Sequence, residues 1–341
     1  MQLSIIGVTG YSGLELLRLL YNHPHVSISG LYGYSSTGRK ISEIYPHLLG
    51  IIDTVVEPVN PEKIMKESDL VFFATPSGVA KEGAIPFIEA NFPVIDLSGD
   101  FRLTQEDYEK WYKKAAAPQA YLEKAEYGLA DFEQPQGKLI ANPGCYATAT
   151  LLGLAPLVQK QLIENSSIIV DAKSGLSGAG KKLSENSHFS FISDNMLLYK
   201  QNEHQHIPEI LQQLQKWDKN VPYLQFQTSL IPVKRGIFVT SYAKVKAGVS
   251  EQELFHAYLQ VYADKRFVRI QPQGKLPSLK QVIGSNYCDI GLAFNEETGI
   301  VTVVSVIDNL VKGAAGQAIQ NMNVLAGFES DAGLMQVPVF P

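Results

Sequence analysis

The sequence predicts an α/β domain of the Rossmann type followed by an α+β domain built on a mixed, largely antiparallel sheet. Three observations lead to this prediction. The 341 residues amount to about two domains of roughly 150 residues each. A strand, glycine turn, helix and strand open the chain, and strand-like segments dominate its second half. We expect residues 1–145 to form the first domain, residues 146–310 to form the second, and residues 311–341 to return to the first.

The first domain begins with a βαβ unit. Residues 3–8 are a short apolar run, residues 7–13 a glycine-rich turn, and the leucines of residues 14–20 a helix that ends near Pro24. Residues 26–32 predict the second strand, so the unit has the length and order of a dinucleotide fold. Apolar runs at 70–74, 94–97 and 140–141 alternate with helical stretches, which is typical of a parallel sheet with right-handed crossovers.

The second domain begins after a turn at residues 142–145. Residues 147–158 predict a helix, and strands follow at 168–172, 225–231, 237–245 and, as a pair, 289–294 with 300–307. An amphipathic helix is expected at 251–263. The last helix, 313–325, is rich in Ala, Gly, Gln and Asn, and such small residues allow close packing.

Composition excludes several classes of protein. The net charge of −5 argues against binding nucleic acid by phosphate neutralisation. Two cysteines cannot build a disulfide framework. No basic leader precedes an apolar run, and no stretch approaches the roughly 18 apolar residues that a membrane helix needs. We therefore expect a cytoplasmic protein that binds neither membranes nor nucleic acid.

The glycine turn indicates a nucleotide site. Gly7, Gly10 and Gly13 are spaced G-x-x-G-x-x-G between a strand and a helix, where glycines let the backbone approach a pyrophosphate at the helix N-terminus. The alternative is a tight structural turn. Residues 33–40, GYSSTGRK, follow the second strand without an acidic residue. Hydroxyls and two cations there favour NADP over NAD, unless the loop is merely solvated.

Cys145 is the candidate nucleophile. It follows Pro143-Gly144 and begins a predicted helix, and the N-terminus of a helix favours the nucleophilic thiolate. The alternative is an ordinary buried cysteine. Cys288 starts a predicted strand without such a setting, so we assign it to packing.

Two of the seven histidines, His204 and His206, stand close together before a predicted helix. Residues two apart do not share a helix face, so we expect one to face the cysteine and the other to face solvent or a structural partner. Metal binding by H-x-H is the rival interpretation, but further ligands with a metal-site spacing are missing. His23, His25, His47, His188 and His256 are expected in loop or surface positions.

Three segments carry groups that suit an anionic substrate. Arg102 ends the segment that follows the strand at 94–97, and ligands of open α/β sheets bind at such strand ends. Ser174 and Gly175 lie in a glycine- and hydroxyl-rich loop, and Lys234-Arg235 follows an apolar stretch. Each taken alone is equally well a plain turn with solvated side chains.

Together these motifs resemble the N-acetyl-gamma-glutamyl-phosphate reductase family of arginine biosynthesis, which is related to the aspartate-semialdehyde dehydrogenases. The resemblance extends from residue 7 to residue 323. It is carried by GVTGYSG, FFATPSG, DLSGDFR, NPGCYATA, KSGLSGAGK, NEHQHIPEI, PVKRGIF and DNLVKGAAGQAIQNMN.

The resemblance implies roles for individual residues. Cys145 matches the nucleophile, and His204 the acid/base residue, with His206 as the alternative or a substrate-binding neighbour. The implied NADP contacts are Gly7, Thr9, Gly10, Tyr11, Ser12 and Gly13, then Ser36 and Arg39 at the 2′-phosphate, Thr75 and Pro76 at the adenine and ribose side, and Asn309 near the nicotinamide. The implied substrate or phosphate contacts are Arg102, Ser174 and Gly175, with Lys234 and Arg235 added from their sequence context.

The implied reaction is NADPH-dependent reduction of an acyl phosphate, N-acetyl-L-glutamyl 5-phosphate, to its semialdehyde through a thioester on Cys145, with no metal. The resemblance also implies a homo-oligomer, a dimer or tetramer. Two alternatives stay open. One is the same chemistry on aspartyl or aminoadipyl phosphate, and the other is a non-catalytic NADP-binding sensor.

Overall fold

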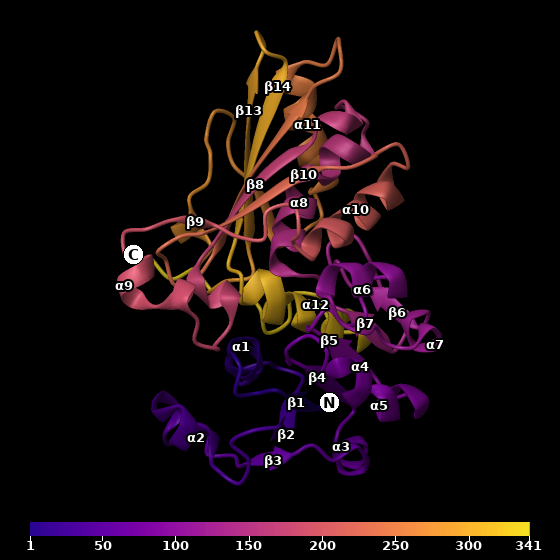
Figure 1. Cartoon of the computed structure of the whole chain (residues 1–341), viewed down its shortest axis with the longest axis vertical. Helices are drawn as coiled ribbons and strands as arrows, with labels where there is room; N and C mark the ends of the chain where they lie inside the picture. The colour runs from indigo at the N-terminus through magenta and orange to yellow at the C-terminus, as the bar shows by residue number, and fades with distance from the viewer. Residues whose placement is uncertain (341) are drawn as a thin grey trace. The chain divides into compact units, whose positions relative to one another are not determined.

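The computed structural model describes residues 1–340, which divide into two compact units. Unit 1 comprises Met1–Pro143 and Ala314–Met335, and unit 2 comprises Gly144–Gly313 together with residues 336–340. Figure 1 labels the helices and strands of both units.

Unit 1 is built on a seven-stranded sheet with the order β3-β2-β1-β4-β5-β7-β6, in which every pairing is parallel. The predicted parallel sheet is therefore confirmed. Its strands are β1 (Gln2–Ile6), β2 (Ser27–Gly33), β3 (Val56–Pro58), β4 (Leu70–Phe73), β5 (Val94–Asp96), β6 (Ala125–Tyr127) and β7 (Leu139–Ala141).

The strand order reverses between β1 and β4. The chain moves outward from β1 to β2 on one side and continues from β4 to β5 on the other. Ligands of open α/β sheets bind beyond the carboxyl ends of the strands at such a switch point. Gly7 follows β1 there, and Ala74 follows β4.

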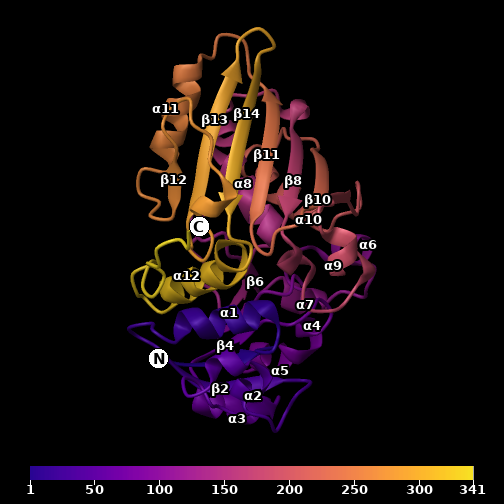
Figure 2. The ribbon, with the colours of Figure 1, turned by 90° about the vertical axis from the view of Figure 1, so that its left-hand side faces the viewer.

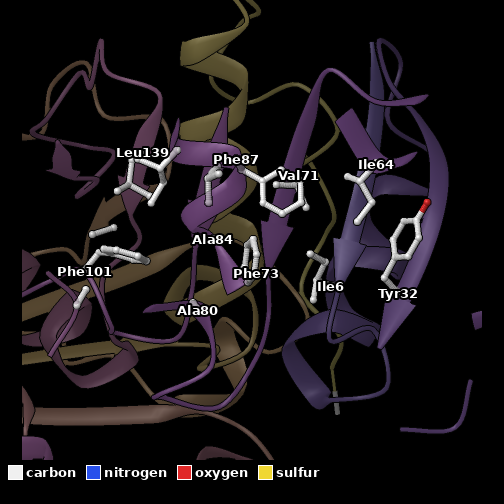
Figure 3. Packing of buried hydrophobic residues seen from close by; sticks show 14 residues of the cluster. Ile6, Tyr32, Ile64, Val71, Phe73, Ala80, Ala84, Phe87, Phe101 and Leu139 are labelled. Carbon is white, nitrogen blue, oxygen red and sulfur yellow. The ribbon is translucent and has the colours of Figure 1, made fainter. Parts of the chain in front are cut away.

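Apolar side chains of the sheet and its helices form the core of unit 1. Figure 3 shows part of it, with Phe73 and Phe87 in edge-to-face contact at a centroid distance of 5.8 Å. Helix α12 packs against α1 and β5 in this unit. The helices are α1 (Tyr11–Leu20), α2 (Ile41–Ile44), α3 (Pro61–Glu67), α4 (Ala80–Gly83), α5 (Ile85–Glu89), α6 (Gln105–Tyr112), α7 (Gln119–Leu122) and α12 (Gly316–Leu325), with a 3₁₀ turn at Pro46–Leu48.

Unit 2 is built on a mixed seven-stranded sheet with the order β12-β13-β14-β11-β8-β10-β9. Only β8 with β10 and β12 with β13 run parallel, so the predicted mixed sheet is confirmed, including the predicted pair β13–β14. Its strands are β8 (Ile169–Ser174), β9 (Leu197–Leu198), β10 (Gln225–Leu230), β11 (Ile237–Lys244), β12 (Val268–Ile270), β13 (Cys288–Asn295) and β14 (Ile300–Ile307).

Helix α8 packs on β11 and β14 and is flanked by α10 and α11. Figure 2 shows the face of β13, β14, β11 and β8 that lies away from α8, with α8 behind the sheet. On that face the cross-strand neighbours Ile169 and Tyr242 keep 49% and 36% of their surface exposed. The helices of unit 2 are α8 (Cys145–Gln159), α9 (Phe189–Ile192), α10 (His206–Trp217) and α11 (Glu251–Val261), with 3₁₀ turns at Asn165–Ser167, Leu176–Ala179, Glu185–Ser187 and Leu279–Gln281.

Two sequence expectations differ from the structure. The last helix does not begin at residue 313 as an α-helix. It opens with a π-helical turn, Val311–Ala315, in which the Gly313 N–H donates to the Asp308 carbonyl at 3.0 Å. His23, expected in a loop or at the surface, does lie in the loop between α1 and β2, but it is buried, because its Nε2 bonds the Asn323 side chain at 2.9 Å and residue 333 packs on its ring.

Candidate functional site

The glycine turn of unit 1 brings the ends of β1 and β4 together. Gly7 has a φ of +88°, and a Cβ added to it would lie 2.4 Å from the Ala74 carbonyl oxygen. A Cβ on Gly13 would lie 2.4 Å from the Gly7 oxygen. Both obstacles are backbone atoms, so no larger side chain fits at either position. Sequence spacing alone could not separate this crowding from an ordinary turn.

The space beside this turn suits a nucleotide. Helix α1 begins after Gly10 without a side-chain cap, so its first N–H groups are placed as in an anion site. The hydroxyl of Thr75, after β4, is buried without a hydrogen-bond partner. Buried hydroxyls normally have a partner, and a bound ligand would supply one. The predicted contacts Thr9, Tyr11 and Ser12 lie in the same turn, and Pro76 follows Thr75.

The loop after β2 presents cations and hydroxyls. Ser36 has a φ of +61°, and the Arg39 side chain is 54% exposed, with its Nη2 donating to the Glu43 carbonyl at 3.2 Å. This loop has the donors that a 2′-phosphate requires. No carboxylate directly follows β2, so the loop lacks the acidic group that would bind the ribose 2′-hydroxyl of NAD.

Arg102 is buried in unit 1 rather than extended toward solvent. Its Nε donates to the Asn142 carbonyl at 2.8 Å and its Nη2 to the Leu97 carbonyl at 2.9 Å. The Arg102 guanidinium thus joins the segments that follow β5 and β7, and its assignment to substrate phosphate stays a prediction. In the first of these segments, burial and the nearby charge of Asp100 raise the pKa of Asp96 to about 6.

In unit 2, Cys145 is the first residue of α8 and is partly exposed. The preceding N–H, that of Gly144, donates to Oε1 of Glu209 at 2.7 Å. Glu209 is fully buried, so this contact fixes the turn that carries the thiol. Helix α8 begins without a side-chain cap, and N–H groups at the start of a helix are donors of the kind that stabilise an oxyanion.

The two predicted histidines occupy different environments. His206 begins α10, and its Nε2 lies 2.2 Å from the position that a Cβ on Gly144 would take and 3.9 Å from Oε2 of Glu209. His204 is enclosed by the rings of Tyr146 and Phe226, and its Nδ1 accepts the His206 N–H at 3.2 Å. Burial, followed by the charge of His206, holds the pKa of His204 well below its ordinary value.

A short chain of hydroxyls lies behind the thiol. The Tyr199 hydroxyl donates to that of Tyr146 at 3.0 Å, which donates to the Ser229 carbonyl at 3.2 Å. Burial raises the pKa of both tyrosines, so they are neutral donors at physiological pH.

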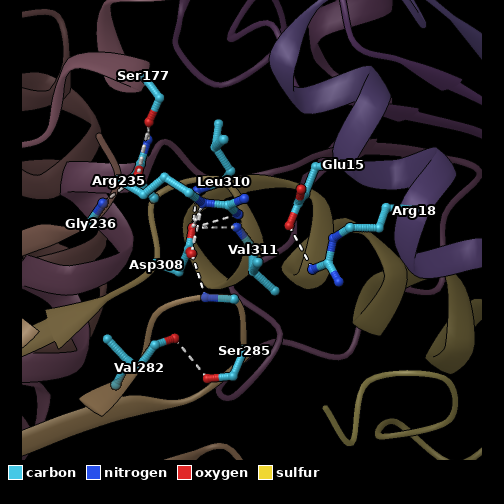
Figure 4. Close-up of polar contacts among 12 residues, drawn as sticks. Glu15, Arg18, Ser177, Arg235, Gly236, Val282, Ser285, Asp308, Leu310 and Val311 are labelled. Carbon is cyan, nitrogen blue, oxygen red and sulfur yellow. Dashed lines mark hydrogen bonds and ion pairs between the residues drawn. The ribbon is translucent and has the colours of Figure 1, made fainter. Parts of the chain in front are cut away.

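The predicted anion-binding loop is tied to the end of β14. Gly175 lies against the backbone of Arg235, because a Cβ added to it would meet the Arg235 nitrogen at 2.9 Å. The Asn309 amide accepts the Gly236 N–H at 2.6 Å and donates to the Ser177 hydroxyl at 3.0 Å (Figure 4). Ser174 is buried and bonded to the Gly175 carbonyl, whereas Lys234 is exposed.

The structure therefore groups the predicted residues in two sets. Unit 2 contains the thiol with the histidines, and also the 174–175 loop with Arg235 and Asn309, whereas unit 1 contains the glycine turn, Thr75 and the 36–39 loop. Sequence reasoning missed Glu209 and Asp308. The H-x-x-E spacing, which places Glu209 on the helix face of His206, was a signal for the first.

Within residues 1–340, no three His, Cys, Asp or Glu side chains are grouped as metal ligands would be. No helix in the same range combines the length and apolar character needed to cross a membrane.

Comparison with known families matches residues 2–309 to the two domains of one type of enzyme. Residues 2–172 match the NAD-binding domain of semialdehyde dehydrogenase, and residues 145–309 its dimerisation domain. A Listeria innocua protein named N-acetyl-gamma-glutamyl-phosphate reductase is 59% identical over 343 residues, and one of the same name from Streptococcus mutans is 55% identical over 341 residues. Both alignments cover 100% of each chain.

Solved structures share the fold at much lower identity. Aspartate semialdehyde dehydrogenase with NADP from Candida albicans has a TM-score of 0.72 at 18% identity, over 95% of this chain and 98% of that one. Aspartate semialdehyde dehydrogenase II from Vibrio cholerae also has a TM-score of 0.72, at 17% identity, over 96% and 98%.

Proposed function

The chain belongs to the N-acetyl-gamma-glutamyl-phosphate reductase family, within the semialdehyde dehydrogenases, and from this membership we propose the reaction that it catalyses. It reduces N-acetyl-L-glutamyl 5-phosphate to N-acetyl-L-glutamate 5-semialdehyde with NADPH and releases phosphate, as a step of arginine biosynthesis. The observation that carries the proposal is the thiol of Cys145 at the start of α8, with His206 against the preceding glycine.

Cys145 attacks the acyl carbon of the substrate. A carbon–sulfur bond forms, the bond from that carbon to the phosphate oxygen breaks, and the acyl group stays on Sγ as a thioester. N–H groups at the start of α8 stabilise the tetrahedral oxyanion on the way. Ser174, Gly175, Lys234, Arg235 and, from unit 1, Arg102 are the proposed phosphate and substrate contacts.

His206 is the proposed acid/base residue. It takes the thiol proton before attack, and after hydride transfer it returns that proton to Sγ as the carbon–sulfur bond breaks and the aldehyde is released. The resemblance of sequence placed His204 first. His204 is less suited, because its Nδ1 already accepts a backbone N–H and its ring is enclosed by aromatic side chains.

Unit 1 binds the cofactor in this proposal. Gly7, Gly10 and Gly13 hold the pyrophosphate together with Thr9, Tyr11 and Ser12, Ser36 and Arg39 hold the 2′-phosphate, and Thr75 and Pro76 contact the adenine and ribose side. Asn309 of unit 2 orients the nicotinamide amide. When bound, NADPH supplies the hydride that reduces the acyl carbon.

We further infer a cytoplasmic homo-oligomer, at least a dimer, in which residues 1–145 with the returning C-terminal helix bind the nucleotide and residues 146–310 carry the chemistry and the subunit contact. The exposed pair Ile169 and Tyr242 supports a contact through the open face of the unit 2 sheet. Analytical ultracentrifugation of wild type and Tyr242→Lys tests this inference, since a lysine at the contact should shift the protein toward monomer.

The reaction is tested in reverse, as phosphate-dependent reduction of NADP by N-acetylglutamate semialdehyde, with aspartate semialdehyde as the competing substrate. Cys145→Ser should retain NADPH binding and lose nearly all turnover, and activity within about tenfold of wild type would overturn the nucleophile assignment. His206→Asn should lose more turnover than His204→Asn. No signal with any semialdehyde would favour a nucleotide-binding sensor.

A further inference from the structure

Asp308 is a fully buried carboxylate immediately after β14. One oxygen, Oδ1, accepts the N–H groups of Leu310 and Val311 at 2.9 and 3.2 Å. The other, Oδ2, accepts the Gly284 N–H at 2.7 Å. The Arg235 guanidinium closes the set, with its Nη2 3.0 Å from Oδ1 and its Nε 3.0 Å from Oδ2 (Figure 4). A carboxylate with this many donors is fixed in place.

The hydrogen bonds from the Leu310 and Val311 N–H groups to Asp308 set the position of the segment that touches Cys145. Leu310 precedes the π-helical turn and Val311 is its first residue. The Gly313 N–H of the same turn bonds the Asp308 carbonyl. A Cβ added to Gly313 would lie 2.7 Å from the Cβ of Cys145 and 3.1 Å from its Cα. The backbone of Gly313 is thus in direct contact with the nucleophilic residue, and π-helical turns often occur at functional sites.

The ion pair sets the position of a second group. Arg235 keeps 27% of its side chain exposed while Asp308 is fully buried, so the carboxylate holds the guanidinium from the inside. The backbone of Arg235 lies against Gly175 of the anion-binding loop. Without its carboxylate, the guanidinium would lose the two contacts that fix its plane.

We propose that Asp308 is a positioning residue, which fixes Cys145 through the π-helical turn and Arg235 through the ion pair. The proposal rests on the proposed function for its substrate but not for its geometry. Asp308 itself is buried and acts only through these two neighbours. The attack of the thiol on the substrate needs both the thiol and the cation that contacts the phosphate to be in place. A displacement of about 1 Å in such a group can cost roughly a hundredfold in rate.

The test compares Asp308→Asn with Asp289→Asn. Asp289 is a matched control, since it is also a buried carboxylate of the unit 2 sheet paired with an arginine, here Arg269 at 2.6 and 3.0 Å on the edge strand β12. The readouts are thermal unfolding, kcat and KM for the acyl substrate, and the rate at which iodoacetamide alkylates Cys145, followed by peptide mass spectrometry. The buried Cys288 serves as the internal reference.

Asp308→Asn should lower kcat/KM at least about 30-fold and change the alkylation rate of Cys145 at least threefold, well below its unfolding temperature. Asp289→Asn should lower thermal stability and leave both values within about twofold. If Asp308→Asn changes only thermal stability, the residue is merely structural and the proposal is overturned. Alkylation needs no substrate, so a wild type that turns over no acyl phosphate would defeat the proposed function and leave this test intact.

The Arg235→Gln variant tests the ion pair separately from the π-helical turn. It also keeps the proposal testable if Asp308→Asn does not fold. It leaves the carboxylate with its three N–H donors, so Cys145 alkylation should stay within about twofold of wild type, while KM for the acyl phosphate rises about tenfold. A variant that carries both Asp308→Asn and Arg235→Gln should lose no more substrate affinity than Arg235→Gln alone. An unchanged KM in Arg235→Gln would overturn the part of the proposal that concerns the ion pair.

Discussion

Replacing Gly144 with alanine should displace the ring of His206 and so test whether that ring serves the thiol. Gly144 has ordinary extended dihedral angles, φ −73° and ψ 155°, so alanine introduces no backbone strain. The added methyl would lie 2.2 Å from His206 Nε2 and 2.7 Å from its Cε1. A normal contact between such atoms is about 3.5 Å, so the ring must move by roughly 1 Å.

The ring has little room for this movement. It is buried, and its centroid lies 4.7 Å from that of His204 and 6.0 Å from that of Tyr146. Overpacking of this kind costs about 1–3 kcal/mol of stability, and a displacement of about 1 Å in an acid/base residue can cost roughly a hundredfold in kcat. We therefore expect Gly144→Ala to be folded at room temperature and to lose about a hundredfold in turnover.

The assay is phosphate-dependent reduction of NADP by N-acetylglutamate semialdehyde, with circular dichroism to confirm folding. Gly153→Ala is the matched control, because it changes the same residue type within the helix that Gly144 precedes, and its Cβ would meet no atom closer than the Ser305 hydroxyl, at 3.1 Å. The control should keep turnover within about threefold of wild type. A Gly144→Ala variant that is folded and equally active would refute the reasoning, because the ring position would then not matter.

Three further predictions follow from buried groups. Gly13→Ala would place a methyl 2.4 Å from the Gly7 oxygen. NADPH binding, measured by fluorescence titration, should therefore weaken at least about a hundredfold while the alkylation rate of Cys145 is unchanged. Undiminished binding would contradict the role of the glycine turn. Tyr146→Phe removes the hydroxyl bonded to the Ser229 carbonyl and should cost about 1–3 kcal/mol in urea unfolding, whereas a loss under about 0.5 kcal/mol would show that the hydrogen bond is not needed. The lowered pKa of His204 means that the unfolded chain binds a proton below about pH 6.5 that the folded protein does not bind, so the stability present above that pH falls as the pH drops below it. The His204→Asn variant should lack that part of the pH dependence.

Local patterns in the sequence were enough to predict the βαβ unit, the parallel order that follows from it and the thiol at the start of a helix. Each of these depends on residues a few positions apart, such as Gly7 and Gly13, whose spacing reflects the turn itself. The same holds for the β13–β14 pair, because a short turn joins the two strands.

The remaining features depend on contacts across long stretches of chain. The loop position of His23 follows from the local sequence, but its burial does not, because its hydrogen-bond partner Asn323 lies 300 residues away in sequence. The difference between His204 and His206 arises because Tyr146, Phe226 and Gly144 approach them from other elements. No periodicity within the 202–209 segment carries that information.

The surroundings of Cys145 show why such contacts matter for the chemistry. The thiol residue is preceded by Gly144 and touched by Gly313, and at both positions a Cβ would collide with a neighbour, at 2.2 Å in the first case and 2.7 Å in the second. Backbone rather than side chains therefore surrounds Cys145 on these sides, and backbone is positioned by its hydrogen bonds. Each of the two segments is fixed by one fully buried carboxylate, Glu209 through the Gly144 N–H and Asp308 through the turn that leads to Gly313. Removing either charge should thus move the thiol without touching it, and the two losses should differ in kind, because only Asp308 also holds the cation Arg235.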